Sequence, residues 1–384
     1  MMRWVHLFLT LMVVPIGLSA QQPLTSVGLG YPVEPIDGRS AALGGTGIGL
    51  FGSTYSLRNP ADLLHHPEAG FSLSLASEAV TLDEDQSLKT GRERFTNIRA
   101  LVPFSDWAAS IAFGGVFDQD WSARFLDTLV LADGSAPFEE AREHDGGIST
   151  IDVSLARRLG PFGIGVSAQR LTGSLRQSFF RTFELPIGEA PLLNDGGGMR
   201  EVSYRGWRFK GGASINIADR LLIGGSMSLP TTLTGTVQDT IPNTTDFELP
   251  VVYEIGGSFR LVDELLITAA TGRSPWADAG DVGEYTTHDV TWVGGGIEFG
   301  GLIFLGGRLP LRFGMRRSDL PFSIGADSII EKAFTGGFGW EFQEGLATAD
   351  LSLEIGSRGD ITGTNIQESF TRMILTLSLR QRSP

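Results

Sequence analysis

The sequence contains no cysteine, only three lysines and only five histidines, and it has no long apolar run after residue 20. The absence of cysteine excludes a disulfide framework, a thiolate metal site and a cysteine nucleophile. A membrane-spanning helix needs about 18 uninterrupted apolar residues, and no segment beyond residue 20 reaches that length. If the mature chain spans a membrane, it must therefore do so with the strands of a closed barrel.

The charge is acidic, with 30 basic and 44 acidic residues and a net charge of -14. Residues 1–20 predict a secretory signal peptide cleaved before Gln21, because Arg3 precedes an apolar run that ends in Ser19 and Ala20. Cleavage would remove one basic residue and make the net charge more negative. Nucleic-acid binding depends on a basic face and is not expected here.

From residue 70 onward the dominant pattern is alternation of apolar and polar residues. In 249–261, for example, Leu249, Val251, Tyr253 and Ile255 alternate with residues that are mostly polar or small. In a soluble sandwich the apolar face points inward, whereas in a membrane barrel it points to lipid. Periodicity alone leaves both folds open.

The number of strands and the lengths of the connections favour the barrel. Five connections are short, with long ones between them, as in outer-membrane barrels whose two termini lie in the periplasm. The acidic stretch 118–145 is expected to be a solvated loop, and the apolar connection 300–307 (GGLIFLGG) is the one poor fit. Fourteen strands are expected, near 70–82, 91–103, 106–117, 147–158, 161–176, 200–217, 220–236, 248–261, 264–274, 288–299, 308–317, 330–342, 346–357 and 366–380.

The stretch from Gly38 to Ala61 is rich in glycine and small residues and carries only two charges, Arg39 and Arg58. Glycine weakens a helix by about 1 kcal/mol per residue relative to alanine, so any helical turn here needs support from surrounding structure. We interpret the stretch as a plug enclosed by the strands, with Asn59-Pro60 as a turn that stops a short helix. The predicted organisation is a leader over 1–20, a plug over 21–69 and an all-β, fourteen-stranded antiparallel transmembrane barrel over 70–384.

The order R-x-x-A-x-G-G followed by N-P-A resembles the N-terminal hatch of the FadL superfamily of outer-membrane transporters, which includes the PorV-like proteins of type IX secretion. The closing strand near Arg372 and Met373 resembles that family as well. The resemblance implies passive uptake of a hydrophobic molecule, such as a long-chain fatty acid, past the hatch and out through the wall. The alternative is a PorV-like partner of protein secretion or surface attachment. The hatch residues are Arg39, Ala42, Gly44, Gly45, Asn59, Pro60 and Ala61.

In the FadL family a kink in the third strand opens a lateral window, and the third strand here carries Gly114-Gly115. Paired glycines lower the cost of a kink, although similar pairs occur in other strands. Several charges share parity with the polar residues of their strands and are expected to face the lumen. They would either bind ligand or cross-link the wall and plug. The candidates are Arg99, Glu254, Arg260, Arg312 and Arg372.

No pattern predicts catalysis, a metal site or a cofactor. The histidines lack ligand spacing, and the pair His65-His66 is expected in a wet linker. The run Gly294 to Gly296 is not followed by the Lys-Ser/Thr of a nucleotide loop, so strand twist is the simpler explanation. We therefore expect a non-enzymatic, integral outer-membrane protein without cofactors. Its expected partners are lipid and a hydrophobic small molecule, with secretion proteins as the alternative and no nucleic acid.

Overall fold

A computed structural model describes residues 28–83, 88–131, 134–183, 195–238, 243–279, 286–323, 327–360 and 367–381. The expected leader and residues 21–27 of the expected plug lie outside these ranges. No helix among the described residues is long and apolar enough to span a membrane.

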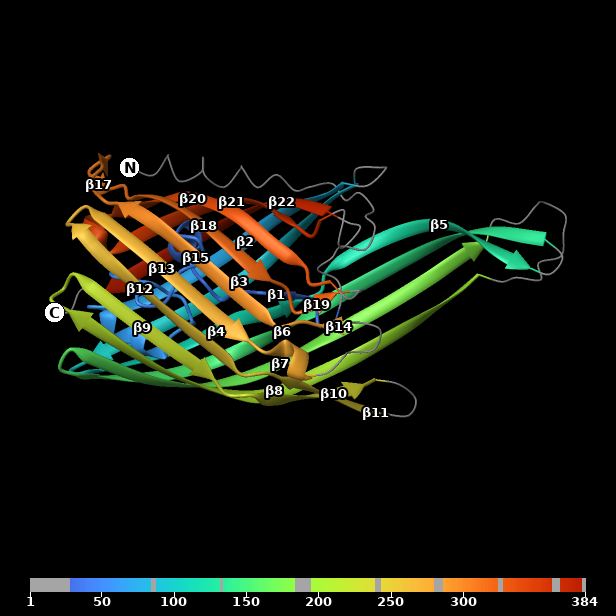
Figure 1. Cartoon of the computed structure of the whole chain (residues 1–384), viewed down its shortest axis with the longest axis horizontal. Helices are drawn as coiled ribbons and strands as arrows, with labels where there is room; N and C mark the ends of the chain where they lie inside the picture. The colour runs from blue at the N-terminus through green and yellow to red at the C-terminus, as the bar shows by residue number, and fades with distance from the viewer. Residues whose placement is uncertain are drawn as a thin grey trace.

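Eighteen strands form one antiparallel sheet, and fourteen of them make a closed barrel, which we call the wall (Figure 1). The barrel closes where the first wall strand pairs with the last, from Ala69 opposite Gln381 to Asp83 opposite Gln367. The predicted strand number is confirmed. The wall strands are β2 (Ala69–Asp83), β3 (Leu88–Phe104), β4 (Trp107–Asp118), β6 (Gly134–Leu159), β7 (Phe162–Phe183), β8 (Gly196–Ile217), β9 (Leu221–Ser228), β12 (Val252–Val262), β13 (Leu265–Ser274), β15 (Val290–Phe299), β18 (Leu311–Asp319), β20 (Ile330–Phe342), β21 (Ala347–Arg358) and β22 (Gln367–Gln381).

The outward face of the wall is apolar and the inward face is polar. On β12, Tyr253, Ile255 and Phe259 are 52%, 56% and 42% exposed, whereas Ser258 is only 2% exposed. Such a surface is stable only in an apolar solvent, because each exposed side chain would otherwise order water around it. The exposure pattern thus decides between sandwich and membrane barrel in favour of the barrel.

Three short strands continue wall strands at the end opposite the C-terminus. β5 (Trp121–Leu131) follows β4, β10 (Thr231–Val237) follows β9, and β11 (Asn243–Leu249) precedes β12. Pro230 and Pro250 lie at two of the interruptions, where proline removes a ladder donor. Figure 1 shows β5, β6 and β7 extending well beyond the barrel at this end. By the rule of short periplasmic turns, this long-strand end is extracellular.

The expectation of a loop over 118–145 is wrong, because most of this stretch forms β5 and the first half of β6. Trp121 pairs with His144 across the ladder, and their rings lie 4.4 Å apart. The acidic side chains are partly neutralised by arginines: Glu140 forms ion pairs with Arg142 and Arg181. The strands therefore continue through this stretch, although its many acidic residues make it resemble a solvated loop in the sequence.

Residues 28–68, which we call the hatch, include β1 (Tyr31–Pro32), α1 (Gly38–Ala42) and the 3-10 helix η3 (Pro60–His65). Asn59 is the N-cap of η3, and its side chain accepts a hydrogen bond from the N–H of Ala61 at 3.0 Å. Proline suits the first turn of a helix because its missing N–H would have no intrahelical partner there. Asn59-Pro60 therefore begins a helix, and the prediction that it stops one is wrong.

The remaining elements are short. β14 (Thr286–Thr287) pairs with β19 (Phe322–Ser323) near the extracellular end. η4 (Trp276–Ala279) follows β13, and η5 (Gln343–Gly345) connects β20 to β21. The apolar connection 300–307 forms a hairpin, in which β16 (Ile303–Phe304) pairs with β17 (Gly307–Arg308).

Candidate functional site: the hatch and the lumen

Glycines on the inward face of the wall provide the seat of the hatch. A Cβ on Gly294 would lie 1.9 Å from the carbonyl oxygen of Gly44, and a Cβ on Gly212 would lie 2.0 Å from Asn59 Oδ1. Gly44 has a φ of +76°, a left-handed conformation that glycine adopts without strain. The wall glycines thus let the hatch backbone approach the strands. This close approach explains Gly294 better than the strand twist expected from the sequence.

Arg39 ties the hatch to the wall. Its Nε and Nη2 each donate to the carboxylate of Glu298 on β15 at 2.8 Å, and its Nη1 donates to the carbonyl of Ser53 at 3.3 Å. Burial works to lower the pKa of Arg39, but the neighbouring Glu298 carboxylate outweighs it and raises that pKa. Gly45, at a φ of +74°, turns the chain away just after this anchor.

The residues Asn59, Pro60 and Ala61 hold the second helical turn against β8. Asn59 Nδ2 donates to the carbonyl of Ala213 at 3.2 Å and to Asp62 Oδ1 at 3.0 Å. Asp62 Oδ2 also accepts a hydrogen bond from a backbone N–H of the hatch at 3.0 Å. Burial raises the pKa of Asp62 to about 7, because these neutral donors only partly replace water around the carboxylate.

The histidine pair lies inside the hatch, so the prediction of a wet linker is wrong. His66 is 4% exposed, and its Nε2 lies 2.7 Å from the carbonyl oxygen of Thr54. Burial, with the nearby Arg99, lowers the pKa of His66 to about 3. His65 lies 3.3 Å from Ser214 Oγ, and burial lowers its pKa to about 4. Both imidazoles are therefore neutral in the seated hatch at neutral pH.

The first two lumen charges named from the sequence, Arg99 and Glu254, contact the middle of the hatch. Arg99 Nη1 of β3 donates to the carbonyl of Ser56 at 2.5 Å. Glu254 of β12 forms an ion pair with Arg58, whose guanidinium also lies 4.1 Å from the ring centroid of Trp292. Each charge therefore has a hatch group as a partner.

Two further lumen charges lie near the periplasmic end. The guanidinium of Arg260 lies 4.6 Å from the ring centroid of Phe51 in the hatch. Arg312 donates to Glu298 and to Asp350, both at 2.6 Å. Around them are two polar cavities of about 410 and 860 Å³, and Phe51 and Arg260 line both. The periplasmic mouth is therefore polar around the hatch.

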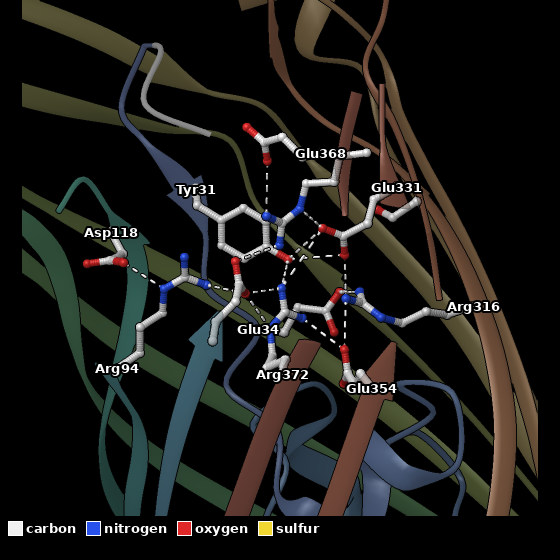
Figure 2. Close-up of polar contacts among 12 residues, drawn as sticks. Tyr31, Glu34, Arg94, Asp118, Arg316, Glu331, Glu354, Glu368 and Arg372 are labelled. Atoms are coloured by element: carbon white, nitrogen blue, oxygen red, sulfur yellow. Dashed lines mark hydrogen bonds and ion pairs between the residues drawn. The ribbon is translucent and has the colours of Figure 1, made fainter. Parts of the chain in front are cut away.

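The fifth charge, Arg372, belongs to a largely buried network of carboxylates and arginines on seven neighbouring wall strands, β18, β20, β21, β22, β2, β3 and β4 (Figure 2). Arg372 Nε donates to Glu78 at 2.7 Å and its Nη1 donates to Glu354 at 3.0 Å. The strand register puts opposite charges face to face, as in Glu354 with Arg372 and Arg358 with Glu368. Removing one member of a buried ion pair typically costs about 3–5 kcal/mol, so the network strongly constrains this side of the lumen.

Five members of this network were not predicted from the sequence. The four on β2, β20, β21 and β22 share the parity of the inward polar residues of their strands, so counting charges of that parity could have found them. Arg94 could not have been found in this way, because a bulge between it and Arg99 changes the inward parity along β3. The missed residues are Glu78, Arg94, Glu331, Arg358 and Glu368.

Tyr31 of β1 lies at the centre of the network in Figure 2. Arg372 Nη2 donates to the Tyr31 hydroxyl at 2.7 Å, and that hydroxyl donates to Glu331 at 3.2 Å. The guanidinium groups of Arg94 and Arg358 lie 4.4 and 4.8 Å from the centroid of its ring. A cation held over an aromatic face and shielded from water is attracted by the ring. The network thus grips the N-terminal segment of the hatch.

The ladder between β3 and β4 ends at the pair Asn97 and Gly114, which we call the wall break. Beyond it β3 continues to pair with β2, and β4 pairs with β6 and, over Tyr31 and Pro32, with β1. A register shift on β4 lies just past Gly115. Gly114 and Gly115 therefore lie where the third wall strand leaves the second.

Hatch residues and one ion pair cover the wall break. Val33 donates its N–H to the carbonyl of Val116 at 2.9 Å, and a Cβ on Gly115 would lie 3.0 Å from Val33 Cγ1. Arg94 of β3 donates to Asp118 of β4 at 2.6 Å. The described structure therefore has the break closed from the inside.

An apolar cluster fills the extracellular part of the lumen. Along the inward face of β7, the polar Gln169 is followed by the buried Leu171 and Leu175, so the face changes character toward this end. The cluster includes four aromatic rings with neighbouring centroids 5.3 to 6.4 Å apart. We call it the aromatic cluster; it consists of Leu29, Val116, Phe117, Ile148, Leu171, Leu175, Leu233, Phe247, Leu249, Trp276 and Phe322.

The remaining histidines have structural partners. The ring of His144 lies tilted against Trp121, and His288 Nε2, just after β14, lies 2.7 Å from Ser323 Oγ of β19. Ser323 is 2% exposed, so its hydroxyl is not open to a substrate. Among the described residues, no group of three or more histidine or acidic side chains could hold a metal ion.

A scan of the sequence against family models finds no match, and a search of curated proteins finds none either. Among solved structures, a FadL homologue from Pseudomonas aeruginosa has a TM-score of 0.62 and 12% identity over 90% of this chain and 98% of its own. The toluene transporter TbuX from Ralstonia pickettii has a TM-score of 0.61 and 15% identity over 91% of this chain and 99% of its own. The toluene transporter TodX from Pseudomonas putida has a TM-score of 0.58 and 15% identity over 91% of this chain and 98% of its own.

A closed fourteen-stranded barrel with an apolar outer face and a lumen occupied by its own N-terminal segment defines an integral outer-membrane protein. Its fold is that of the FadL-type barrels, which confirms at the level of the fold the resemblance seen in the sequence.

The first prediction tests the glycine seat. Gly212→Val should displace the hatch, because the new side chain would overlap Asn59 and overpacking costs about 1–3 kcal/mol. We expect higher conductance in planar bilayers and faster tryptic cleavage at Arg58. The matched control is Gly211→Val, where a Cβ would meet no atom within 4 Å. Equal conductance of the two variants would show that the hatch does not depend on this contact.

The second prediction concerns pH. His66 has a pKa of about 3 in the seated hatch and 6.5 in the unfolded chain, so its contribution to stability is lost as pH falls from 6.5 toward 3. The pKa of Asp62 is raised to about 7, so its contribution to the stability of the hatch increases as pH falls through the upper part of this range. Relative to wild type, His66→Gln should therefore resist hatch proteolysis better at pH 5 than at pH 7.5. An unchanged ratio at the two pH values would contradict the burial of a neutral imidazole.

Proposed function

We propose that the protein is a passive outer-membrane channel for small hydrophobic molecules, which bind in the aromatic cluster and leave sideways through the wall break. The main support for the proposal is that the aromatic cluster and the wall break are adjacent. Val116 and Phe117 belong to the aromatic cluster and also lie on β4 just beyond Gly115, where its pairing with β3 has ended. An apolar molecule in the cluster is thus already beside the gap in the ladder.

An exit along the barrel axis would be unfavourable for such a molecule. It would have to pass the seated hatch and polar cavities lined by Arg39, Glu298 and Arg312. Moving an apolar solute past buried charges means partly desolvating those charges without replacing their partners. A lateral exit leads instead from an apolar cluster to lipid.

We favour a monoaromatic hydrocarbon over a fatty acid as the ligand. Aromatic rings pack well edge to face, and the cluster already contains such pairs, as between Trp276 and Phe322 at 5.3 Å. A fatty acid would need a cation for its carboxylate, and Arg94, beside the break, is already paired with Asp118. TbuX and TodX are named as toluene transporters, and CymD, with the same fold, as a monoaromatic hydrocarbon channel.

The route requires two movements. Phe322 lies on β19, outside the barrel sheet, and its ring can withdraw from the cluster without breaking the wall. Val33 must leave Gly115 for the break to open, which releases its hydrogen bond to Val116. Because the arginine network holds Tyr31 only two residues away, opening at Val33 is coupled to that network.

The third prediction tests the exit. Replacing both Gly114 and Gly115 with valine should place two side chains in the wall break itself, against Val33 and the β3 backbone, and straighten the strand, so that the break stays blocked even when Val33 moves. We expect uptake of radiolabelled toluene to fall by about tenfold or more, with heat-modifiable gel migration unchanged. The control, Ala109→Val, lies in the paired part of the same strand. Undiminished uptake by the folded double variant would exclude this exit.

The fourth prediction tests the binding site. Trp276→Ser should weaken toluene uptake at low concentration, because it removes the ring that contacts the other three aromatic side chains. Loss of such a ring costs about 1–3 kcal/mol of binding, which corresponds to an increase of roughly 5- to 140-fold in the half-saturating concentration. Saturation curves for toluene and a long-chain fatty acid would also rank the two ligands. The PorV-like alternative predicts no uptake of either and co-purification of protein cargo.

A further inference from the structure

The connection between β15 and β18 is a built hairpin at the periplasmic end. Ile303 pairs with Arg308 and Phe304 with Gly307, and Leu309 donates its N–H to the carbonyl of Leu302 at 2.9 Å. The two residues of the turn, Leu305 and Gly306, have φ values of +48° and +78°. Two successive residues with positive φ are typical of the tight turn that matches strand twist. Leu305 therefore adopts a left-handed conformation, which is unfavourable for a residue with a side chain, in order to form this turn.

The tip of the hairpin is apolar and exposed. Ile303, Phe304 and Leu305 are 78%, 52% and 77% exposed, and Leu302 is 39% exposed. Of the five other short connections at this end, four are mainly polar (105–106, 218–220, 263–264 and 343–345) and the fifth, 160–161, is Gly-Pro. Four consecutive exposed apolar side chains are unfavourable in water and mark a contact with an apolar phase or partner.

The position of the hairpin identifies that phase. A Cβ on Gly307 would lie 2.9 Å from Nε1 of Trp340, which shares outward parity with the exposed Phe334 and Phe338 of β20. Phe299, the last residue of β15, is likewise exposed on the outward face. Figure 1 shows β17 at the rim of the short-turn end. The hairpin therefore continues the lipid-facing belt at the level where tryptophan is enriched in membrane proteins.

We propose that residues 302–305 insert into the periplasmic leaflet and anchor this side of the barrel in the membrane interface. The apolar side chains of Ile303, Phe304 and Leu305 occupy the boundary between headgroups and acyl chains. Arg308, paired opposite Ile303, lines the polar cavity at the periplasmic mouth, so the charged base of the hairpin is at the lumen and only its tip is apolar. The ligand is thus a phospholipid surface, and the anchor is independent of what the channel carries.

The absence of cysteine allows a direct test. Ile303→Cys is labelled with a nitrobenzoxadiazole fluorophore and reconstituted in vesicles of phosphatidylethanolamine and phosphatidylglycerol. We expect blue-shifted emission and quenching by nitroxide-labelled lipid at least about twofold stronger than at the control site. The control is Asp263→Cys, in the exposed polar turn between β12 and β13. Phe304→Cys is the second variant in case the first fails to fold, as judged by heat-modifiable migration.

Emission from the hairpin equal to that from Asp263→Cys would place the tip in water and overturn the proposal. Blue-shifted emission without quenching by lipid nitroxide would mean that the tip packs on protein, and this too would overturn it. A blue shift seen only in native membranes and not in vesicles would indicate a protein partner in place of lipid.

Discussion

Backbone hydrogen bonding in hydrocarbon is the constraint on which the structure depends. No water reaches the bilayer core, so every N–H and C=O of a spanning strand must pair with a neighbour, and a sheet can do this only by closing on itself. The wall meets this demand where β2 pairs with β22 over fifteen consecutive residue pairs. The β3–β4 ladder ends early, at Gly114, and the backbone N–H and C=O groups beyond that point cost free energy unless other groups pair with them. The hatch supplies such groups through β1 and Val33, so one segment both seals the wall and blocks the lumen.

The hatch is held by two kinds of contact, one that depends on steric fit and one that depends on charge. Gly294 allows the backbone of the hatch to approach the wall, and Gly212 leaves room for the side chain of Asn59; both contacts depend on shape and tolerate no added side chain. Arg39 with Glu298 and the network around Tyr31 depend on charge, and each buried member needs its partner. A molecule that displaces the segment near Val33 therefore works against local ionic contacts, while the glycine seat keeps α1 and η3 in place.

The lumen changes character along the barrel, and this order fits the proposed transport. The extracellular part holds the aromatic cluster, with the arginine and carboxylate network beside it toward the ends of β20, β21 and β22, and the periplasmic mouth is polar around Arg39 and Arg260. An apolar solute finds a favourable environment only in the first of these, directly beside the wall break. Selectivity then rests on the contrast between the cluster and the charged layer as much as on the cluster itself.

Alternation of side chains predicted the fourteen strands, and almost all boundaries lie within a few residues, because strand periodicity is a local property. The resemblance to the FadL-type hatch likewise rested on a short stretch of sequence that includes Arg39, Gly44 and Asn59. Which glycines face the hatch, and why Glu78 meets Arg372, depended on register between strands far apart in the chain. The acidic residues of 118–145 concealed a strand pair in part because some of their arginine partners, such as Arg94 and Arg181, come from strands outside the stretch. The sequence by itself thus determined the barrel, while only the tertiary structure decided where the β3–β4 ladder ends, because the end of a ladder depends on the register of two strands and not on either alone.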